Sequence, residues 1–170
     1  MSPSNSTAAT SPLSLEQQIC YAMHTTVRAF DAVYRELLSE HGLSYPQYIA
    51  LMGVGEHGPM TVSSLGEHMR LDSGTLSPLL KRMEAAGLVG RSRDPEDERR
   101  VLVRVTAAGR DKLAGLQDMP QRIAARSGLT REQMLALHQT LRTVTECLDH
   151  QPGDRGDADL RTAAGSRWRG

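Results

Sequence analysis

The clearest hydrophobic pattern in the chain lies in the segment 71–87. Its apolar residues recur at three- and four-residue spacing, which places them on one face of a helix: Leu76, Leu79, Leu80 and Met83. Asp72 or Ser73 can cap the start of this helix, and Gly87 suits the left-handed position after its last turn. Pro78 would fit the first helical position but would cost a backbone hydrogen bond in the second turn, so we expect a loose first turn.

A second pattern, with the two-residue period of a half-buried strand, follows this helix. It alternates valines with other residues over Arg100, Val101, Leu102, Val103, Arg104 and Val105. The segment 88–93 can supply the partner strand, with a polar turn at 94–98. A helix followed by a hairpin with basic edges suits DNA, because the helix can enter the major groove while the hairpin follows the backbone or the minor groove. A small helix–hairpin unit with an ordinary solvated face fits the same pattern.

The remaining helices are expected at 15–40, 45–57, 62–69, 107–125 and 131–150. Three of them begin with a capping box, in which Ser14, Ser44 and Thr130 each precede a glutamine by three residues. Thr61 and Thr106 can cap the other two. The proline at position 120 should bend or split the helix at 107–125.

The first and last helices are too long for the small central unit at 45–106 to bury alone. We therefore expect the segments 14–41 and 107–150 to pack against a second copy and form a homodimer, within one domain at 14–150. Two reading helices on a two-fold axis would bind an inverted repeat in double-stranded DNA. The polar segments 1–13 and 151–170 are expected to be a disordered arm and a disordered tail.

Composition and charge narrow the classes of function. The 170 residues carry 20 basic and 20 acidic side chains, which argues against a histone-like or polybasic binder but not against a repressor with local arginines. No apolar run reaches membrane-spanning length, no signal peptide is visible, and two distant cysteines make no disulfide framework, so we expect a cytoplasmic protein. Without a glycine-rich phosphate loop or a catalytic constellation, we expect neither a cofactor nor an enzyme.

Cys20 is the candidate for chemistry. A cysteine in a helix is more often a small buried apolar residue than a reactive one. Two features favour reactivity: Cys20 lies near a helix N-terminus, where the dipole favours a thiolate, and His24 lies one turn further on the same face. The pair could instead be half of a metal site, but other ligands do not cluster in the sequence and we expect no metal. The remaining histidines are scattered and are expected at the surface or at helix ends: His41, His57, His68, His138 and His150.

The segment 71–106 resembles the winged helix-turn-helix of the MarR family of bacterial repressors. The triplet Asp97-Glu98-Arg99 matches that family's wing-tip Asp-x-Arg pattern, in which the acid orients the arginine towards the minor groove. The stretch LDSGTLSPLLKRMEAAGLV resembles more narrowly the recognition helix of the organic-hydroperoxide repressors (OhrR). The resemblance runs from about residue 15 to the start of the last helix. It implies a mainly α fold with a small β-hairpin wing, dimerised through the N- and C-terminal helices.

Within this unit we expect the DNA-reading side chains on the polar face of the helix. They are Ser73, Thr75, Ser77 and Lys81, divided between base edges and phosphates. Arg99, oriented by Asp97, is expected to be the wing arginine.

The resemblance also implies a redox sensor. In hydroperoxide repressors a reactive cysteine occupies the place of Cys20, and two tyrosines that hydrogen-bond it match Tyr34 and Tyr45, the latter in SYPQY, which resembles the subgroup's TYPQY. Burial alone would explain each tyrosine equally well as a packed aromatic with a satisfied hydroxyl. In that family the cysteine becomes a sulfenic acid and then a disulfide with a small thiol or a second cysteine, and DNA is released.

Two departures from the subgroup affect this interpretation. His24 replaces a further tyrosine common near the sensor cysteine. A resolving cysteine would fall near 124–126, which has none, so we expect Cys147 to be buried and inert and the protein to be a one-cysteine sensor. A MarR-type repressor released by a phenolic or other small ligand shares the fold and is the alternative. A thiol peroxidase using Cys20 has less support, because no CxxC motif is present.

Overall fold

The computed structural model describes residues 14–149, so the predictions for 1–13 and 151–170 lie outside the described residues. In chain order the elements are η1 (Leu15–Gln17), α1 (Ile19–Ser39), α2 (Tyr45–His57), β1 (Met60–Thr61), α3 (Val62–Met69), α4 (Ser73–Ala85), β2 (Val89–Arg93), β3 (Val101–Val105), α5 (Ala107–Ala114), α6 (Met119–Ser127) and α7 (Arg131–Asp149). The prediction of a mainly helical fold with a small β-hairpin is confirmed. No helix within 14–149 is both long and apolar enough to cross a membrane.

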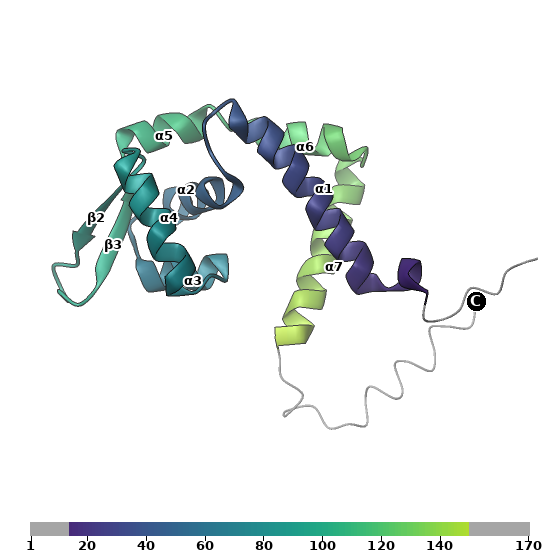
Figure 1. Cartoon of the computed structure of the whole chain (residues 1–170), viewed down its shortest axis with the longest axis horizontal. Helices are drawn as coiled ribbons and strands as arrows, with labels where there is room; N and C mark the ends of the chain where they lie inside the picture. Colours follow the sequence, from purple (N-terminus) through teal and green to yellow (C-terminus); the bar gives the residue numbers. More distant parts are fainter. Residues whose placement is uncertain (1–13, 150–170) are drawn as a thin grey trace, which may run out of the picture. The chain divides into compact units, whose positions relative to one another are not determined.

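The sheet contains the predicted hairpin and one strand that the sequence analysis missed. β2 pairs with β3 in antiparallel register from Val89 opposite Val105 to Arg93 opposite Val101 (Figure 1). β1 adds to the free edge of β3, with Met60 opposite Val103, so the strand order is β1-β3-β2. A two-residue strand is too short to show a period, which explains why the pattern of the sequence did not reveal it.

The core lies where α2, α3 and α4 pack together with the sheet and with the C-terminal end of α1. Its largest fully buried side chains are Leu38, Leu51, Val54, Leu65, Leu76, Leu80, Met83, Val89, Val103 and Met119. The four predicted apolar residues of α4 are all among the buried core residues. Burial of this one stripe is what fixes the orientation of α4 and leaves its polar side outward.

The first turn of α4 is more regular than predicted. Asp72 is the N-cap, and its Oδ1 accepts the backbone N–H of Thr75 at 2.9 Å. Pro78 lies inside the helix, in the second turn, where the carbonyl of Gly74 loses its usual N–H partner. Because Gly74 and Pro78 are both exposed, water can satisfy that carbonyl, and the capped helix tolerates the proline. Gly87 follows α4 with a φ of 70°, as predicted.

The start of α1 differs from the prediction. The Ser14 side chain makes no cap hydrogen bond, and residues 15–17 form a separate 3-10 turn that uses the backbone donors of Gln17 and Gln18. The α-helix therefore begins only at Ile19, with Gln18 as its N-cap residue. This places Cys20 at the second position of the helix, closer to its N-terminus than expected.

The other predicted caps and breaks are present. Ser44 and Thr130 each form a reciprocal capping box with the glutamine three residues on, and Thr61 and Thr106 cap α3 and α5. The helix expected at 107–125 is split into α5 and α6. Pro120 lies in the first turn of α6, where a proline needs no N–H donor, so the break falls just before it.

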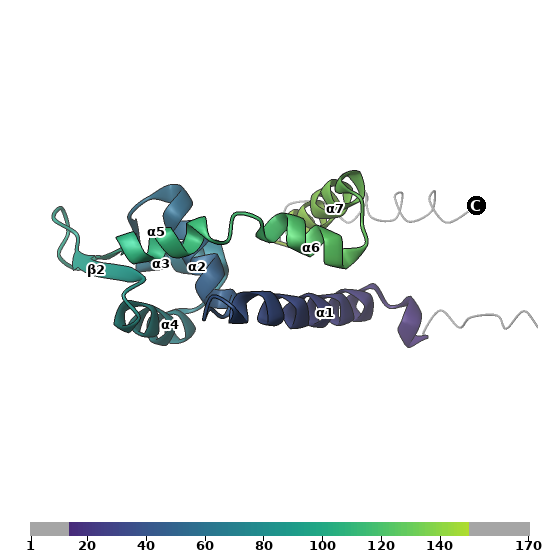
Figure 2. The ribbon, with the colours of Figure 1, turned by 90° about the horizontal axis from the view of Figure 1, so that it is seen from above.

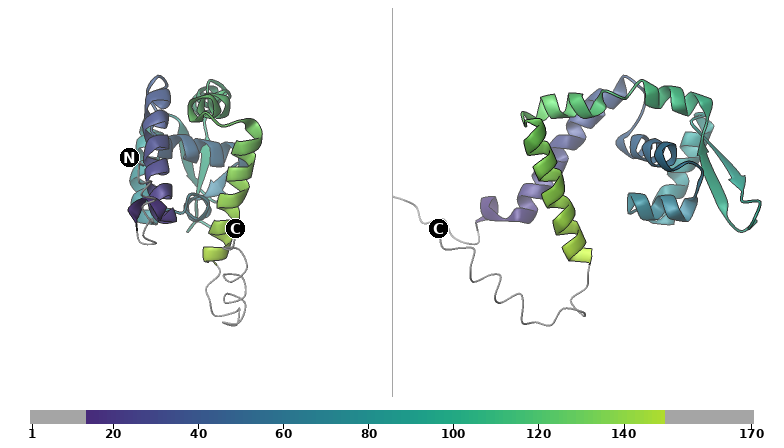
Figure 3. Two further views of the ribbon diagram at one scale, coloured as in Figure 1. Left: turned by 90° about the vertical axis from the view of Figure 1, so that its right-hand side faces the viewer. Right: turned by 180° about the vertical axis from the view of Figure 1, so that it is seen from behind.

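The described residues fall into two compact units, the first ending at Ile123 and the second beginning at Ala124. We call α2, α3, α4 and the three-stranded sheet the winged core, and the β2–β3 hairpin the wing. In the first unit, α1 extends outward from the winged core, so that the N-terminal half of α1 is not covered by it (Figure 2). In the second unit, α7 is one unbroken helix with no buried residue (Figure 3). Both helices thus present apolar side chains that one chain does not bury.

Candidate nucleic-acid interface and thiol site

A tight turn joins α3 to α4. Arg70 adopts the left-handed conformation with a φ of 52°, and Leu71 donates its backbone N–H to the carbonyl of Gly66 at 2.9 Å. A Cβ at position 66 would lie 2.9 Å from the Leu71 carbonyl oxygen, so this close approach requires glycine. Two short helices held at such a turn form a helix-turn-helix, with α3 supporting and α4 presenting its outer face.

The outer face of α4 carries the predicted DNA-reading residues. Ser73, Thr75 and Lys81 are exposed, and Ser77 is half-buried at the edge of a cleft. The hydroxyl of Thr75 donates to Oδ2 of Asp72 at 3.1 Å, so it can offer only its lone pairs to another partner. Hydrogen bonds from the backbone and side chain of Thr75 lower the pKa of the Asp72 carboxyl, which keeps this cap charged.

The turn between β2 and β3 is held by its own hydrogen bonds. The backbone N–H of Arg100 donates to the Asp97 carbonyl at 2.8 Å, and that of Asp94 donates to the Arg100 carbonyl at 3.0 Å. The N–H of Glu96 donates to Oδ1 of Asp94 at 3.0 Å. A turn with this many internal bonds presents its side chains from a defined backbone.

Asp97 contacts Arg99, as predicted, but through the backbone of Arg99, and it also contacts Arg100. Its Oδ1 accepts the backbone N–H of Arg99 at 3.1 Å, and its Oδ2 lies 3.3 Å from Nε of Arg100. The carboxylate therefore holds the backbone at Arg99 and pairs with the guanidinium of Arg100, whereas the sequence analysis expected it to orient the Arg99 guanidinium. An acid two residues before an N–H forms this local turn readily, and the neighbouring arginine lies within its reach.

An ion pair links α4 to the wing. Nε of Arg91 on β2 donates to Oε2 of Glu84 at 2.8 Å, and its Nη2 contacts the same oxygen. The hydrogen bonds from Arg91 lower the pKa of the Glu84 carboxyl. Further along β2, Nη1 of Arg93 donates to the carbonyl of Glu98 at 2.9 Å. The sequence analysis did not predict the Glu84–Arg91 pair, because it joins residues on different elements.

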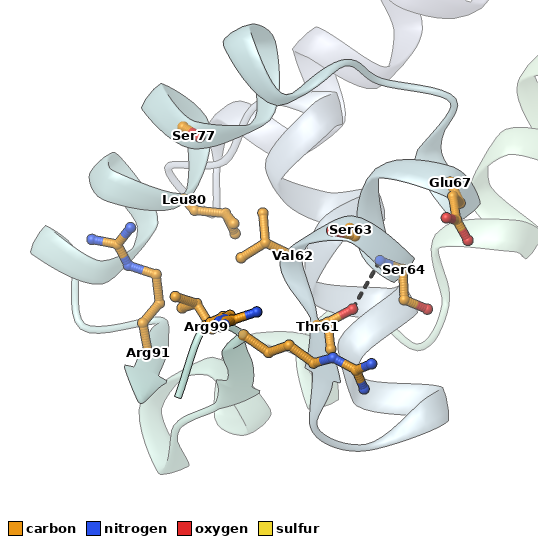
Figure 4. Close-up of a pocket in the computed structure, with 11 residues that line it drawn as sticks. Thr61, Val62, Ser63, Ser64, Glu67, Ser77, Leu80, Arg91 and Arg99 are labelled. Carbon is orange, nitrogen blue, oxygen red and sulfur yellow. Dashed lines mark hydrogen bonds between the residues drawn. The ribbon is translucent and has the colours of Figure 1, made fainter. Parts of the chain in front are cut away.

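Between α3, α4 and the wing lies a cleft of about 600 Å³. Its lining combines hydroxyls and the Glu67 carboxylate from α3, the inner side of α4, and three arginines of the wing, Arg91, Arg99 and Arg100, so the guanidinium groups outnumber the carboxylate. Figure 4 shows Ser77 and Leu80 projecting from α4 on one side and Thr61 and Ser63 at the start of α3 on the other. Hydroxyls and guanidinium groups facing one opening favour a negatively charged, oxygen-rich partner.

Cys20 is exposed on α1, and His24 follows one turn later, also exposed. Tyr34 lies 14 residues further along the same helix, which corresponds to about 21 Å at 1.5 Å per residue. Cys20 and Tyr34 therefore cannot touch within one chain. The described residues contain no group of three or more His, Cys, Asp or Glu side chains that could hold a metal.

Tyr34 and Tyr45, the two predicted tyrosines, do lie together. Their ring centroids are 4.6 Å apart, and the ring of Tyr48, which the sequence analysis did not include, lies tilted with its centroid 6.2 Å from that of Tyr34. Burial, together with Tyr45 and Tyr48, raises the pKa of Tyr34 to about 12. Burial and the charge of Asp31 raise the pKa of Tyr45. The cluster is thus a set of protonated phenols at neutral pH, able to donate hydrogen bonds.

The expectation that Cys147 is buried is wrong for the single chain. Cys147 is exposed, like the other side chains of its half of α7. The last helix was expected to pack against a second copy, and in the single chain its apolar residues Leu135, Leu141, Val144 and Leu148 are all exposed. Periodicity identifies an apolar face but not what covers it.

Comparison with known proteins places this arrangement among transcriptional regulators. The profile of the MarR family matches residues 43–101, from just before α2 to the start of β3. An organic hydroperoxide resistance transcriptional regulator of Bacillus subtilis (strain 168) is 40% identical over 139 residues, which cover 82% of this chain and 94% of that protein. The HTH-type transcriptional regulator TtmR of Methylorubrum extorquens (strain PA1) is 38% identical over 156 residues, covering 92% and 78%.

Among solved structures, that of reduced AbfR bound to DNA is similar over most of the chain. The two are 30% identical, and the match covers 79% of this chain and 93% of that one with a TM-score of 0.65. The likeness therefore extends beyond the winged core to the terminal helices.

Proposed function

The chain belongs to the MarR family of transcriptional regulators, and on that premise we propose that it is a DNA-binding repressor that releases its operator when an organic hydroperoxide oxidises Cys20. Its partners are double-stranded DNA with an inverted repeat, a second copy of the chain, and the oxidant. The steps of the proposal rest on the outer face of α4, on two uncovered apolar faces, and on the position of Cys20.

DNA binding follows from the shape and charge of the winged core. α4 is capped, amphipathic and exposed on one side, and a major groove about 12 Å wide admits a helix of this kind. Ser73, Thr75 and Lys81 occupy its exposed side. The wing carries Arg99 at its tip, next to a turn held by Asp97, and can reach the flanking backbone or minor groove.

Two faces that a single chain leaves open support the proposed dimer. The N-terminal half of α1 exposes Ile19, Met23 and Val27, which are 71%, 38% and 58% exposed. The apolar side of α7 is exposed as well. Each face repeats at helical spacing, as expected of helices that pack against a second copy. In contrast, α5 packs on α2 and β3, so the C-terminal dimer surface begins after it.

The proposed dimer would also bring Cys20 to the tyrosine cluster. The separation of about 21 Å along one helix rules out a contact within a chain. If two α1 helices pack antiparallel, Cys20 of one copy can approach Tyr34 and Tyr45 of the other. Protonated phenols there would donate hydrogen bonds to the sulfur, as the raised pKa of Tyr34 allows.

The proposed chemistry is a two-electron oxidation of sulfur. The Cys20 thiol attacks one oxygen of the hydroperoxide, the O–O bond breaks, and an alcohol leaves with the thiol proton while Cys20 becomes a sulfenic acid. A small thiol can then displace water to form a mixed disulfide. Because one misplaced methylene in packed apolar surroundings costs about 1 kcal/mol, an adduct of several atoms can shift the dimer between two arrangements.

One observation carries this proposal: Cys20 is exposed at the second position of α1, beside an apolar face that a second copy would cover, in a chain 40% identical to an organic hydroperoxide regulator. The test is DNA binding by the reduced protein, measured by fluorescence anisotropy on DNA from upstream of its own gene. An organic hydroperoxide should weaken binding by the parent about a hundredfold, or about 3 kcal/mol, and leave Cys20→Ser unaffected.

Cys147→Ser is the matched control, since it removes the other exposed thiol. It should respond like the parent if Cys20 acts without a second cysteine. A Cys20–Cys147 disulfide between subunits on non-reducing gels would replace the one-cysteine mechanism with a two-cysteine one. Release of DNA from Cys20→Ser by a phenolic compound would favour the alternative, a repressor that responds to a small ligand.

A further inference from the structure

Two histidines outside the thiol site come together at the ends of two helices. His57 is the last residue of α2, and His68 lies in the last turn of α3. Their ring centroids are 4.8 Å apart, with an interplanar angle of 66°, and both side chains are exposed. This pairing is not predictable from the sequence pattern, because the residues are 11 positions apart on different helices.

The hydrogen bonds of the two rings define their tautomers. Nδ1 of His57 lies 3.0 Å from the carbonyl oxygen of Gly53, and Nδ1 of His68 lies 2.9 Å from that of Ser64. A carbonyl oxygen can only accept, so each Nδ1 carries the hydrogen and donates it. In the neutral rings each Nε2 then keeps its lone pair. A histidine that binds a metal through one nitrogen typically donates the other N–H to a carbonyl or carboxylate in this way.

The spacing of the rings suits a shared ion. Two imidazoles bound through Nε2 to one tetrahedral ion, with metal–nitrogen bonds of about 2.1 Å, place their centroids about 5 Å apart. The observed 4.8 Å is close to this value. Both histidines also lie at helix C-termini, where the helix dipole attracts a cation.

We propose that His57 and His68 form a binding site for one divalent transition-metal ion of the kind that imidazole prefers, such as Zn²⁺ or Ni²⁺, which cross-links α2 to α3. The described residues offer no third His, Cys, Asp or Glu ligand here, so water completes the coordination. A cross-link between α2 and α3 would restrain the helix-turn-helix, because α3 packs against α4. The site is independent of oxidation at Cys20.

The test titrates the reduced, chelator-treated full-length protein with Zn²⁺ or Ni²⁺ in competition with a chromogenic indicator. The parent should bind one ion per chain at this site, and either His57→Gln or His68→Gln should weaken binding at least about tenfold. His138→Gln removes an exposed histidine on α7, and Cys20→Ser removes the thiol next to His24; both should bind like the parent.

Thermal unfolding supplies a second readout. Because both rings are exposed, the metal-free variants should unfold at the temperature of the metal-free parent, and added metal should raise the Tm of the parent but not of His57→Gln or His68→Gln. Parent-like metal binding by either single variant would overturn the proposal. An equal loss of binding in Cys20→Ser or His138→Gln would overturn it as well.

Discussion

Arg99 is the wing residue whose loss should most directly weaken DNA binding. The other two arginines of the wing tip already have partners within the wing: Arg93 donates to the Glu98 carbonyl and Arg100 pairs with Asp97. Arg99 is exposed and borders the cleft beside α4. One phosphate contact contributes a slope of about 0.9 in log K against log salt concentration, so Arg99→Ala in both subunits should reduce the slope by about 1.8. At about 0.1 M salt this equals a roughly 60-fold weaker affinity, or about 2.5 kcal/mol.

The assay is anisotropy of labelled operator DNA over a range of about 50 to 200 mM salt, which gives both the affinity and the slope. Arg142→Ala removes the same charge from exposed α7 and is the matched control. It should leave the slope close to that of the parent. The assignment of Arg99 to the DNA backbone fails if Arg99→Ala and Arg142→Ala give the same slope as the parent.

Three further substitutions test the wing, the core and the tyrosine cluster. Asp97→Asn keeps an Oδ1 acceptor for the Arg99 N–H and should bind DNA more tightly than Asp97→Ala; equal anisotropy curves would show that the turn bond is unimportant. Met83→Ala, at a fully buried site, should cost about 2–5 kcal/mol and lower the Tm by about 4–20 °C, while Lys81→Ala on the outer face should change little by circular dichroism. Folding raises the pKa of Tyr34 from 10.0 to about 12. The neutral phenol therefore contributes its full stability below pH 10.0, and this contribution is lost as the pH rises towards 12. Urea unfolding at about pH 9 and about pH 11 should show a smaller loss for Tyr34→Phe than for the parent.

Local patterns in the sequence predicted most of the fold. The apolar stripe of α4, the alternating valines of β3 and the caps at Ser44, Thr61 and Thr130 all depend on residues within a few positions of one another. Such patterns predict the structure well because the hydrogen bonds and helix or strand faces that they specify are formed by residues close in sequence. The exception among them is Ser14, where a 3-10 turn took the backbone donors that a capping box would have used.

What the sequence did not predict depends on contacts between elements. β1 exists only because β3 offers it a free edge, and the Glu84–Arg91 pair forms only once the wing lies beside α4. The exposure of Cys147 depends on which neighbour covers α7. The tyrosine pair was expected from family resemblance and is present, but its distance from Cys20 followed only from the observed helix.

The Glu84–Arg91 pair has a consequence for the DNA that this protein can recognise. It joins α4 to β2, the first strand of the wing, and because both elements also pack on the same buried core, their relative position is restrained. Each half-operator must therefore offer its groove-reading bases and its wing-contacting backbone at one fixed offset. A single base pair inserted between them should abolish recognition. An insertion at the centre of the operator should be tolerated better, because it changes only the spacing of the two subunits.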